Sequence, residues 1–191
     1  MQRADAPVTY QYLLTSTNEL NGKIKSRRNP PRCVIGLPMA TAYLMVGFAG
    51  AGKTTYAKEL ALRRRAVRFT PDEWVEQIFP EPLSPTEFDA CFGRICQLVW
   101  SVASQCLCNG QDVILDIGFW SRDSREHARR KVAEIGCACE VIFVDCDESL
   151  ICERLLSRSG SFWTTEGFIR EKLASFERPQ PDELDVVVRG D

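Results

Sequence analysis

Short apolar runs alternate along the chain with longer segments that carry helical periodicity. Five largely apolar runs are of the kind buried in a parallel sheet, at residues 42–46, 66–69, 113–116, 141–145 and 185–189. The longer segments predict helices at residues 54–64, 73–78, 85–108, 122–135, 147–156 and 165–176. This alternation predicts an α/β fold in which helices cover both faces of a parallel sheet.

The first 38 residues lack this pattern. They show no sustained period of either kind and include the basic, proline-broken stretch at residues 26–32. With 191 residues and 45% apolar content, the chain suits one domain. We therefore expect residues 1–38 to be a poorly ordered basic extension, and residues 39–191 to form the folded domain.

The charge of the chain is unevenly distributed. Residues 1–38 carry six Lys and Arg against two Asp and Glu, whereas 18 basic and 24 acidic residues give residues 39–191 a charge of −6. An acidic body argues weakly against tight binding of nucleic acid, whose phosphates need basic partners. No apolar run is long enough to span a membrane and the N-terminus lacks the apolar core of a secretory signal, so a cytoplasmic location is expected.

Cysteine and histidine usage argues against a zinc site. The nine cysteines include no Cys-x-x-Cys pair, and the chain contains a single histidine.

A glycine-rich loop follows the first predicted strand and precedes a predicted helix. Residues 47–54 read Gly-Phe-Ala-Gly-Ala-Gly-Lys-Thr, which matches the phosphate-loop pattern in the context that the pattern requires. Its backbone N–H groups and the positive end of the helix would surround phosphates, Lys53 would reach the β and γ phosphates, and the Thr54 hydroxyl would ligate Mg²⁺. ATP and Mg²⁺ are the expected cofactors. The residues expected to bind the nucleotide are Gly47, Ala49, Gly50, Ala51, Gly52, Lys53, Thr54 and Thr55.

Four segments together resemble a known family. Besides the phosphate loop, they are Phe-Thr-Pro-Asp-Glu-Trp at 69–74, the strand end and turn at 113–122, and the helix at 147–158 with arginines four residues apart. Over about residues 42–189 the chain resembles the P-loop kinase group of the AAA-33 type, which includes phage-type polynucleotide 5′-kinases, zeta-type toxins, chloramphenicol phosphotransferase and gluconate kinase.

This resemblance implies a fold and an activity. The fold would be a three-layer P-loop NTPase similar to nucleoside-monophosphate kinases, with a five-stranded parallel sheet in the order 2-3-1-4-5 and a short lid. Residues 39–191 would be the P-loop kinase domain. The activity would be ATP-dependent transfer of a phosphoryl group to a hydroxyl.

The resemblance also assigns roles to individual residues. Lys53, Asp72, Asp116, Arg154 and Arg158 would be catalytic, with Asp72 as the base, Asp116 and Thr54 at the metal and the two arginines in the lid. Each role has a structural alternative: Asp72 as the N-cap of a short helix, Asp116 as a polar strand end, and the arginines as a solvated helix face. Phage-type kinases place the aspartate of the third strand one position later.

The acceptor is less well defined by the sequence. Asp72, Trp74, Phe119 and Arg122 are the candidates for substrate contact, although aromatic residues also suit core packing, and the other arginines of residues 122–130 are expected on a solvated face. Phage-type polynucleotide kinases carry a phosphate-gripping arginine where this chain has Val75. A small hydroxylated molecule is therefore favoured as the acceptor, a 5′-hydroxyl nucleic-acid end is the alternative, and a nucleotide-dependent switch with slow hydrolysis is a third hypothesis. The sequence leaves the oligomeric state open.

Overall fold

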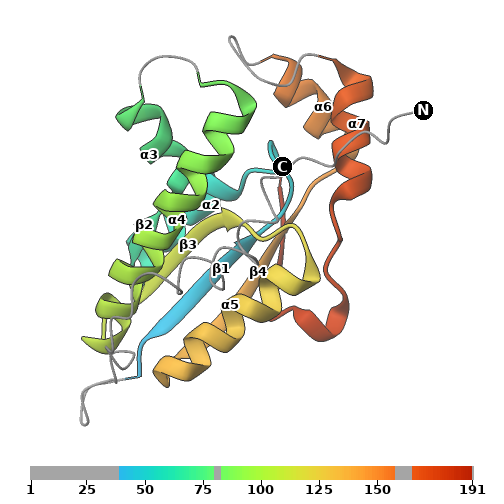
Figure 1. The fold of residues 1–191 in the computed structure, drawn as a ribbon. Coiled ribbons are helices and arrows are strands. Elements are labelled where there is room, and N and C mark those ends of the chain that lie inside the picture. The colour runs from blue at the N-terminus through green and yellow to red at the C-terminus, as the bar shows by residue number, and fades with distance from the viewer. Residues whose placement is uncertain (1–38, 80–82, 158–164, 191) are drawn as a thin grey trace.

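The computed structural model describes residues 39–79, 83–157 and 165–190, which form a parallel sheet between two layers of helices (Figure 1). The strands are β1 (Thr41–Val46), β2 (Val67–Phe69), β3 (Val113–Gly118), β4 (Ala138–Asp145) and β5 (Val186–Arg189). All neighbouring strands pair in parallel, in the order β2-β3-β1-β4-β5. The predicted three-layer architecture and strand order are confirmed.

The helices divide between the two faces of this sheet. They are α2 (Lys53–Arg64), α3 (Pro71–Ile78), α4 (Pro85–Cys108), α5 (Arg122–Ile135), α6 (Glu148–Leu156), α7 (Glu166–Ser175) and the short 3-10 helix η3 (Pro181–Glu183). Successive side chains of β1 point to opposite faces of the sheet. Ala42 and Leu44 pack with α3, α4 and α5, whereas Tyr43 and Met45 pack with α2, α6 and α7. The strand is therefore apolar throughout its length.

Several element boundaries differ from the predicted ones, and the differences at β4 and α3 have clear physical reasons. β4 begins at Ala138, three residues early, because Thr41–Tyr43 of β1 pair with Ala138–Glu140 and extend the ladder beyond the apolar run. α3 begins at Pro71 instead of Glu73, since proline is well suited to the first position of a helix.

Two of the expected features fall outside the described residues. These are the basic extension at residues 1–38 and Arg158, one of the two arginines expected in the lid. Within the described part of the chain, no helix is long and apolar enough to cross a membrane.

A buried arginine joins the helical layer to the C-terminal segment. Arg125 on α5 is 1% exposed, and its guanidinium pairs with both carboxylate oxygens of Glu183 (2.9 and 3.2 Å). The same guanidinium donates to the carbonyls of Phe119 (3.1 Å) and Glu177 (3.0 Å). Burial alone would raise the pKa of the Glu183 carboxyl, but the hydrogen bonds from Arg125 and the Gln180 N–H lower it. The expected solvated face of this helix is therefore wrong at Arg125.

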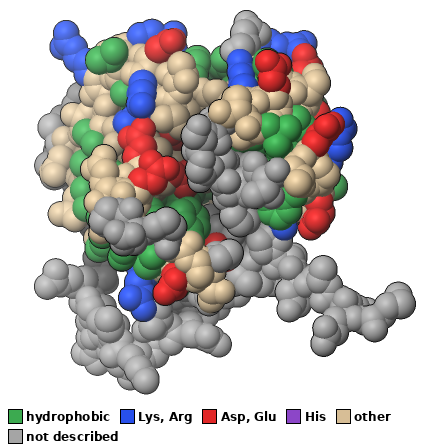
Figure 2. Space-filling model, turned by 90° about the horizontal axis from the view of Figure 1, so that it is seen from above, with side chains coloured by type: hydrophobic (Ala, Val, Ile, Leu, Met, Phe, Trp, Pro, Cys, Tyr) green, Lys and Arg blue, Asp and Glu red, His purple; other side chains and the backbone are tan. Residues whose placement is uncertain are grey.

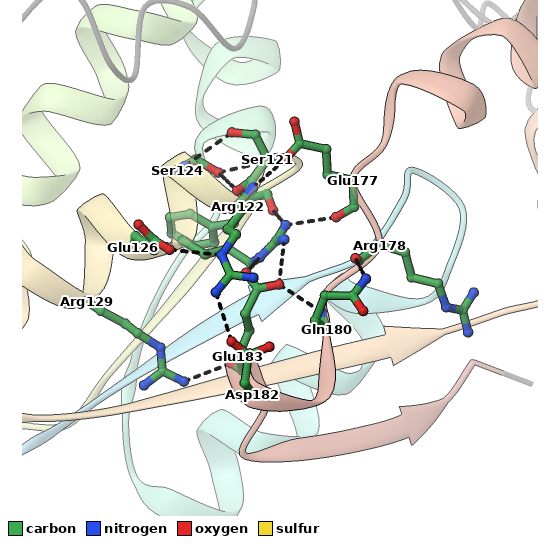
Figure 3. Close-up of polar contacts among 12 residues, drawn as sticks. Ser121, Arg122, Ser124, Glu126, Arg129, Glu177, Arg178, Gln180, Asp182 and Glu183 are labelled. Atoms are coloured by element: carbon green, nitrogen blue, oxygen red, sulfur yellow. Dashed lines mark hydrogen bonds and ion pairs between the residues drawn. The ribbon is translucent and has the colours of Figure 1, made fainter.

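Figure 3 shows the polar contacts around this site. More exposed contacts surround the buried pair. Arg122 forms ion pairs with Glu126 (3.0 Å) and Asp182 (2.8 Å), and Arg129 donates a hydrogen bond to the Glu183 carbonyl (2.8 Å). These contacts hold residues 177–183 against the first turns of α5. Because the surrounding pairs are exposed, the buried pair should dominate their contribution to stability.

Removing one partner of the buried pair should destabilise the fold strongly. Arg125→Met leaves the Glu183 carboxylate buried without its cation, and we expect the free energy of unfolding to fall by ~3–5 kcal/mol. Denaturant unfolding measures this. The double variant Arg125→Met/Glu183→Leu should lose less than the sum of the two single variants; strict additivity would contradict a coupled pair.

Candidate active site

The glycine-rich loop between β1 and α2 depends on backbone conformations that side chains disfavour. Gly47 has a φ of +148°, and a Cβ at this position would lie 2.8 Å from the Val144 carbonyl oxygen of β4. Gly52 has a φ of +95° immediately before α2. These positions let the chain turn sharply from the strand into the helix.

The N-terminus of α2 has the features of an anion site. No side chain caps the helix, and its first turn contains no acidic residue. By contrast, α4 and α5 both begin with a capping box, Ser84 with Glu87 and Ser121 with Ser124. The leading N–H groups of a helix have no partner within it, so the α2 terminus presents donors and a positive dipole end to a phosphate.

The two polar side chains that begin α2 have different partners. Lys53 Nζ donates to the Phe48 carbonyl (2.8 Å), so its ammonium group lies over the loop. Thr54 Oγ1 donates to Asp116 Oδ2 (2.7 Å), which joins the helix to the end of β3. Asp116 is 3% exposed. The structure thus brings together the hydroxyl and the carboxylate expected at the metal.

A β-bulge accompanies the placement of Asp116. Leu44 of β1 aligns with Leu115 of β3 and Val46 with Gly118, so Met45 faces the two residues Asp116 and Ile117. Ile117 is buried in the cluster with α3, α4 and α5, while Asp116 bonds to α2 on the other side. Asp116 itself follows the ordinary alternation of the strand, since Ile114 lies on the same side and Leu115 lies with Ile117.

Asp72 lies in the first turn of α3, close to Lys53 and Asp116. The residue is exposed to solvent at the surface, yet enough protein surrounds its carboxyl that desolvation raises the pKa to about 6. Lys53 lowers this pKa, while Asp116, Glu76 and Glu73 raise it further. Asp72 is not the N-cap, because the helix starts at Pro71 and the capping position is Thr70.

Thr70 is a site residue that the sequence did not single out. It is 3% exposed and lies directly before α3, and its hydroxyl contacts Asp116 Oδ2 (3.2 Å). Arg68 of β2 donates to the same hydroxyl and also pairs with Glu73 (2.7 Å). The sequence contained one signal for it, the position of a hydroxyl side chain two residues before the candidate base.

Arg154 lies beside the phosphate loop but contacts its backbone. Its Nη1 is 3.3 Å from the Gly50 carbonyl oxygen and 3.2 Å from that of Gly190, so it joins α6, the loop and the segment after β5. Such a contact was not expected from the sequence. Arg158, one helical turn further on, lies outside the described residues.

The remaining candidates for substrate contact are placed differently from one another. Trp74 is half-buried and packs edge-on against Phe69, with ring centroids 6.0 Å apart. Phe119 is 1% exposed, so its side chain belongs to the core and not to a substrate surface. Arg122 is engaged with carboxylates of α5 and η3. Of these three, only Trp74 belongs to the helix that carries Asp72.

The face seen from above, where the strands end, carries Asp and Glu side chains on both of its halves. One group lies on the half where α3 and α4 lie, toward the left of Figure 2. Within the described residues, no three His, Cys, Asp or Glu side chains are grouped as metal ligands.

Comparison with family models identifies the family. A model for an AAA domain matches residues 43–179. The chain belongs to this family. No curated protein matches the chain significantly.

Solved structures with the same fold are P-loop kinases. A candidate kinase from Chloroflexus aurantiacus j-10-fl is 19% identical, with a TM-score of 0.65 over 81% of this chain and 86% of its own. APS kinase CysC from Mycobacterium tuberculosis, solved with AMPPNP and APS, is 17% identical, with a TM-score of 0.55 over 81% and 90%. A chain of the Pnkp1/Rnl/Hen1 RNA repair complex is 20% identical, with a TM-score of 0.60 over 72% and 44%. At these identities the likeness establishes the fold.

Crowding the contact between the phosphate loop and Gly190 should weaken nucleotide binding. A Cβ at Gly190 would lie 2.1 Å from the Ala51 carbonyl oxygen, so Gly190→Ala forces the loop or the segment after β5 to move. We expect ATP affinity to fall about tenfold, or ~1.4 kcal/mol, in a calorimetric titration. Gly167→Ala on α7 is the control, because a Cβ added there would meet no other part of the described chain within 4 Å. Unchanged affinity in Gly190→Ala would show that this contact does not shape the loop.

The raised pKa of Asp72 predicts a pH-dependent cost to stability. Between its ordinary value of 3.8 and about 6, the folded protein retains a proton that the unfolded chain releases. Stability should therefore fall as pH rises through this window, and above it the ionised carboxylate opposes folding. Asp72→Asn should have a higher Tm than the wild type at pH 8, with the difference shrinking toward pH 4.

Thermal unfolding across this pH range tests the prediction. Glu171→Gln, which removes the same charge from the exposed surface of α7, separates a local effect from one of net charge. A difference between Asp72→Asn and the wild type that does not change with pH would contradict it.

Proposed function

We propose that this protein transfers the γ-phosphoryl group of ATP to a hydroxyl group of a small molecule, such as a sugar, a metabolite or an antibiotic. The observation that carries the proposal is the grouping of Asp72 with Lys53 and the Thr54–Asp116 pair at one edge of the sheet. A phosphate site alone supports nucleotide binding. The additional carboxylate of Asp72, close enough to Lys53 and Asp116 for both to shift its pKa, supports transfer to an acceptor.

Residues 47–55, which include Lys53, would hold the ATP that donates the phosphoryl group. The loop and the uncapped α2 terminus offer backbone N–H groups to the phosphates, and Lys53 would exchange its bond to the Phe48 carbonyl for a phosphate oxygen. Arg154, which lies against Gly50, would add positive charge on the opposite side of the loop, and Arg158 is the further candidate for a lid arginine. These cations would offset the charge that spreads over the transferred group.

The residues at the end of β3 fit a magnesium ion. The Thr54 hydroxyl and the Asp116 carboxylate are hard oxygen donors, and Mg²⁺ is commonly bound by one or two such groups plus substrate phosphates. Bound there, the ion would neutralise phosphate charge. The protein's own contribution is to hold the two oxygen donors at hydrogen-bonding distance before the ligand arrives.

Asp72 is the proposed general base. As the acceptor oxygen forms its bond to the γ phosphorus and the bond from phosphorus to the ADP oxygen breaks, the hydroxyl proton would pass to the Asp72 carboxylate. A pKa of about 6 leaves this carboxylate ionised at neutral pH yet more basic than an ordinary aspartate. Phosphoryl transfer should therefore decline as pH falls below about 6.

The surroundings of Asp72 favour a small acceptor without phosphate groups. Three carboxylates raise the pKa of its carboxyl: Asp116, Glu76 and Glu73, the last of which is paired with Arg68 and Lys58. Val75, at the position of the phosphate-gripping arginine of phage-type kinases, is 3% exposed and packs in the core. A nucleic-acid end would bring phosphates toward carboxylates, which is unfavourable. The half-buried ring of Trp74 is the proposed apolar lining.

Release of ADP from ATP should depend on an acceptor and on Asp72. A panel of hydroxyl compounds, tested beside a 5′-hydroxyl oligonucleotide, identifies the acceptor class. Asp72→Asn should lower the transfer rate ~10²–10⁴-fold because the base is lost, while ATP affinity stays within about twofold. Glu76→Gln, a neighbouring carboxylate on the same helix, should keep most of the activity.

Two other outcomes of this experiment would favour a different function. Labelling of the oligonucleotide alone, with steep weakening by salt, would favour a polynucleotide 5′-hydroxyl kinase. Slow ATP hydrolysis that responds to no acceptor and is unaffected by Asp72→Asn would favour a nucleotide-dependent switch.

A further inference from the structure

A chain of hydrogen bonds crosses from β2 to the phosphate loop beneath the candidate active site. Arg68 donates to the Thr70 hydroxyl, the Thr70 hydroxyl contacts Asp116 Oδ2 (3.2 Å), and Thr54 Oγ1 donates to that same oxygen (2.7 Å). Thr70 and Asp116 are each 3% exposed. These contacts link β2, β3 and α2 through side chains alone.

The direction of these bonds follows from the donors and acceptors available. A guanidinium can only donate and a hydroxyl has a single proton, so Thr70 accepts from Arg68 and must use its proton toward Asp116. Arg68 therefore fixes the rotation of the Thr70 hydroxyl.

The hydroxyl of Thr70 does not cap the helix that follows it. Thr70 occupies the N-cap position of α3, where a threonine side chain normally accepts a bond from a backbone N–H of the first turn. No such capping bond forms here. The helix forgoes an interaction worth ~1 kcal/mol, and the hydroxyl serves the Asp116 carboxylate instead.

Two hydroxyl donors from different elements hold one oxygen of Asp116. Both bonds end on Oδ2, and within the described residues no hydrogen bond reaches Oδ1. A carboxylate held by a single donor can swing about its χ angles, whereas two donors on α2 and before α3 restrict it. Oδ1 is therefore held in a fixed position and can still accept a ligand.

We propose that Thr70, oriented by Arg68, is a positioning residue that presents Asp116 to the divalent cation accompanying the nucleotide. The inference rests on the proposed function, because it concerns the cation side of the same site. Arg68 has a second effect, since its ion pair with Glu73 (2.7 Å) connects the helix that bears Asp72 to the same chain of bonds. Outer groups of this kind commonly alter metal affinity by ~10–100-fold.

The test compares nucleotide affinity with and without the cation. Thr70→Val keeps the shape of the side chain and removes the hydroxyl, while Thr70→Ser keeps the hydroxyl. Calorimetric titration of ATP in EDTA and at increasing Mg²⁺ gives the Mg²⁺ concentration for half of the cation-dependent gain in affinity. We expect Thr70→Val to raise that concentration about tenfold, with affinity in EDTA within about twofold and Thr70→Ser close to the wild type.

A second pair of variants keeps the inference testable if Thr70→Val fails to fold. Arg68→Met removes the donor to Thr70 from a partly exposed position and should shift the Mg²⁺ dependence in the same direction, whereas Arg68→Lys should restore part of it. Unchanged Mg²⁺ dependence in the folded variants, with a cation-dependent wild type, overturns the positioning role alone. A wild type whose ATP affinity does not respond to Mg²⁺ overturns the proposed function together with it.

Discussion

The 2.7 Å hydrogen bond between Thr54 and Asp116 is the contact on which the candidate site depends. It exists because of the strand order: α2 leaves β1 and reaches β2 by crossing β3, which lies between them, so its first turn passes the end of β3. The helix terminus proposed to bind phosphate and the carboxylate proposed at the metal are therefore neighbours by topology. The glycines of the loop turn the chain sharply into α2, and strand alternation points Asp116 to the same side as Ile114, so the two side chains meet.

The sheet could be predicted almost completely because its strands are continuous apolar runs buried on both faces, a property that each segment displays locally. The exceptions depend on pairing. Residues 138–140 become part of β4 because β1 lies beside them, and no apolar run marks them. The bulge opposite Met45 likewise belongs to the β1–β3 pair, so no single segment displays it.

The candidate site was predictable where a motif carried the chemistry, as for Lys53, Thr54, Asp72 and Asp116. Thr70 was missed because its role arises from contacts between β2, β3 and α2. The burial of Arg125 could have been inferred from its position, since it lies at helical spacing with Ala128, Val132 and Ile135 on the buried face of α5. Its charge pointed instead to a solvated face. Phe119 was assigned to the substrate, but its φ of +43° after Gly118 turns its side chain into the core.

The two sides of the site are attached to the fold in different ways. On the donor side, Gly47 bonds to the Gly118 carbonyl, Phe48 packs on Trp120 with ring centroids 4.6 Å apart, and Phe176 contacts both rings. Arg125 holds the carbonyls of Phe119 and Glu177 on either side of this group. The loop, the end of β3 and the segment after α7 thus form one braced unit.

The helix proposed to face the acceptor, α3, is attached through other elements. Glu73 pairs with Arg68 and Lys58, Trp74 and Val75 pack in the core, and the helix packs against α4. The glycine-rich motif marks residues of the loop and not those of α3, which explains why the sequence indicates the proposed donor more sharply than the acceptor.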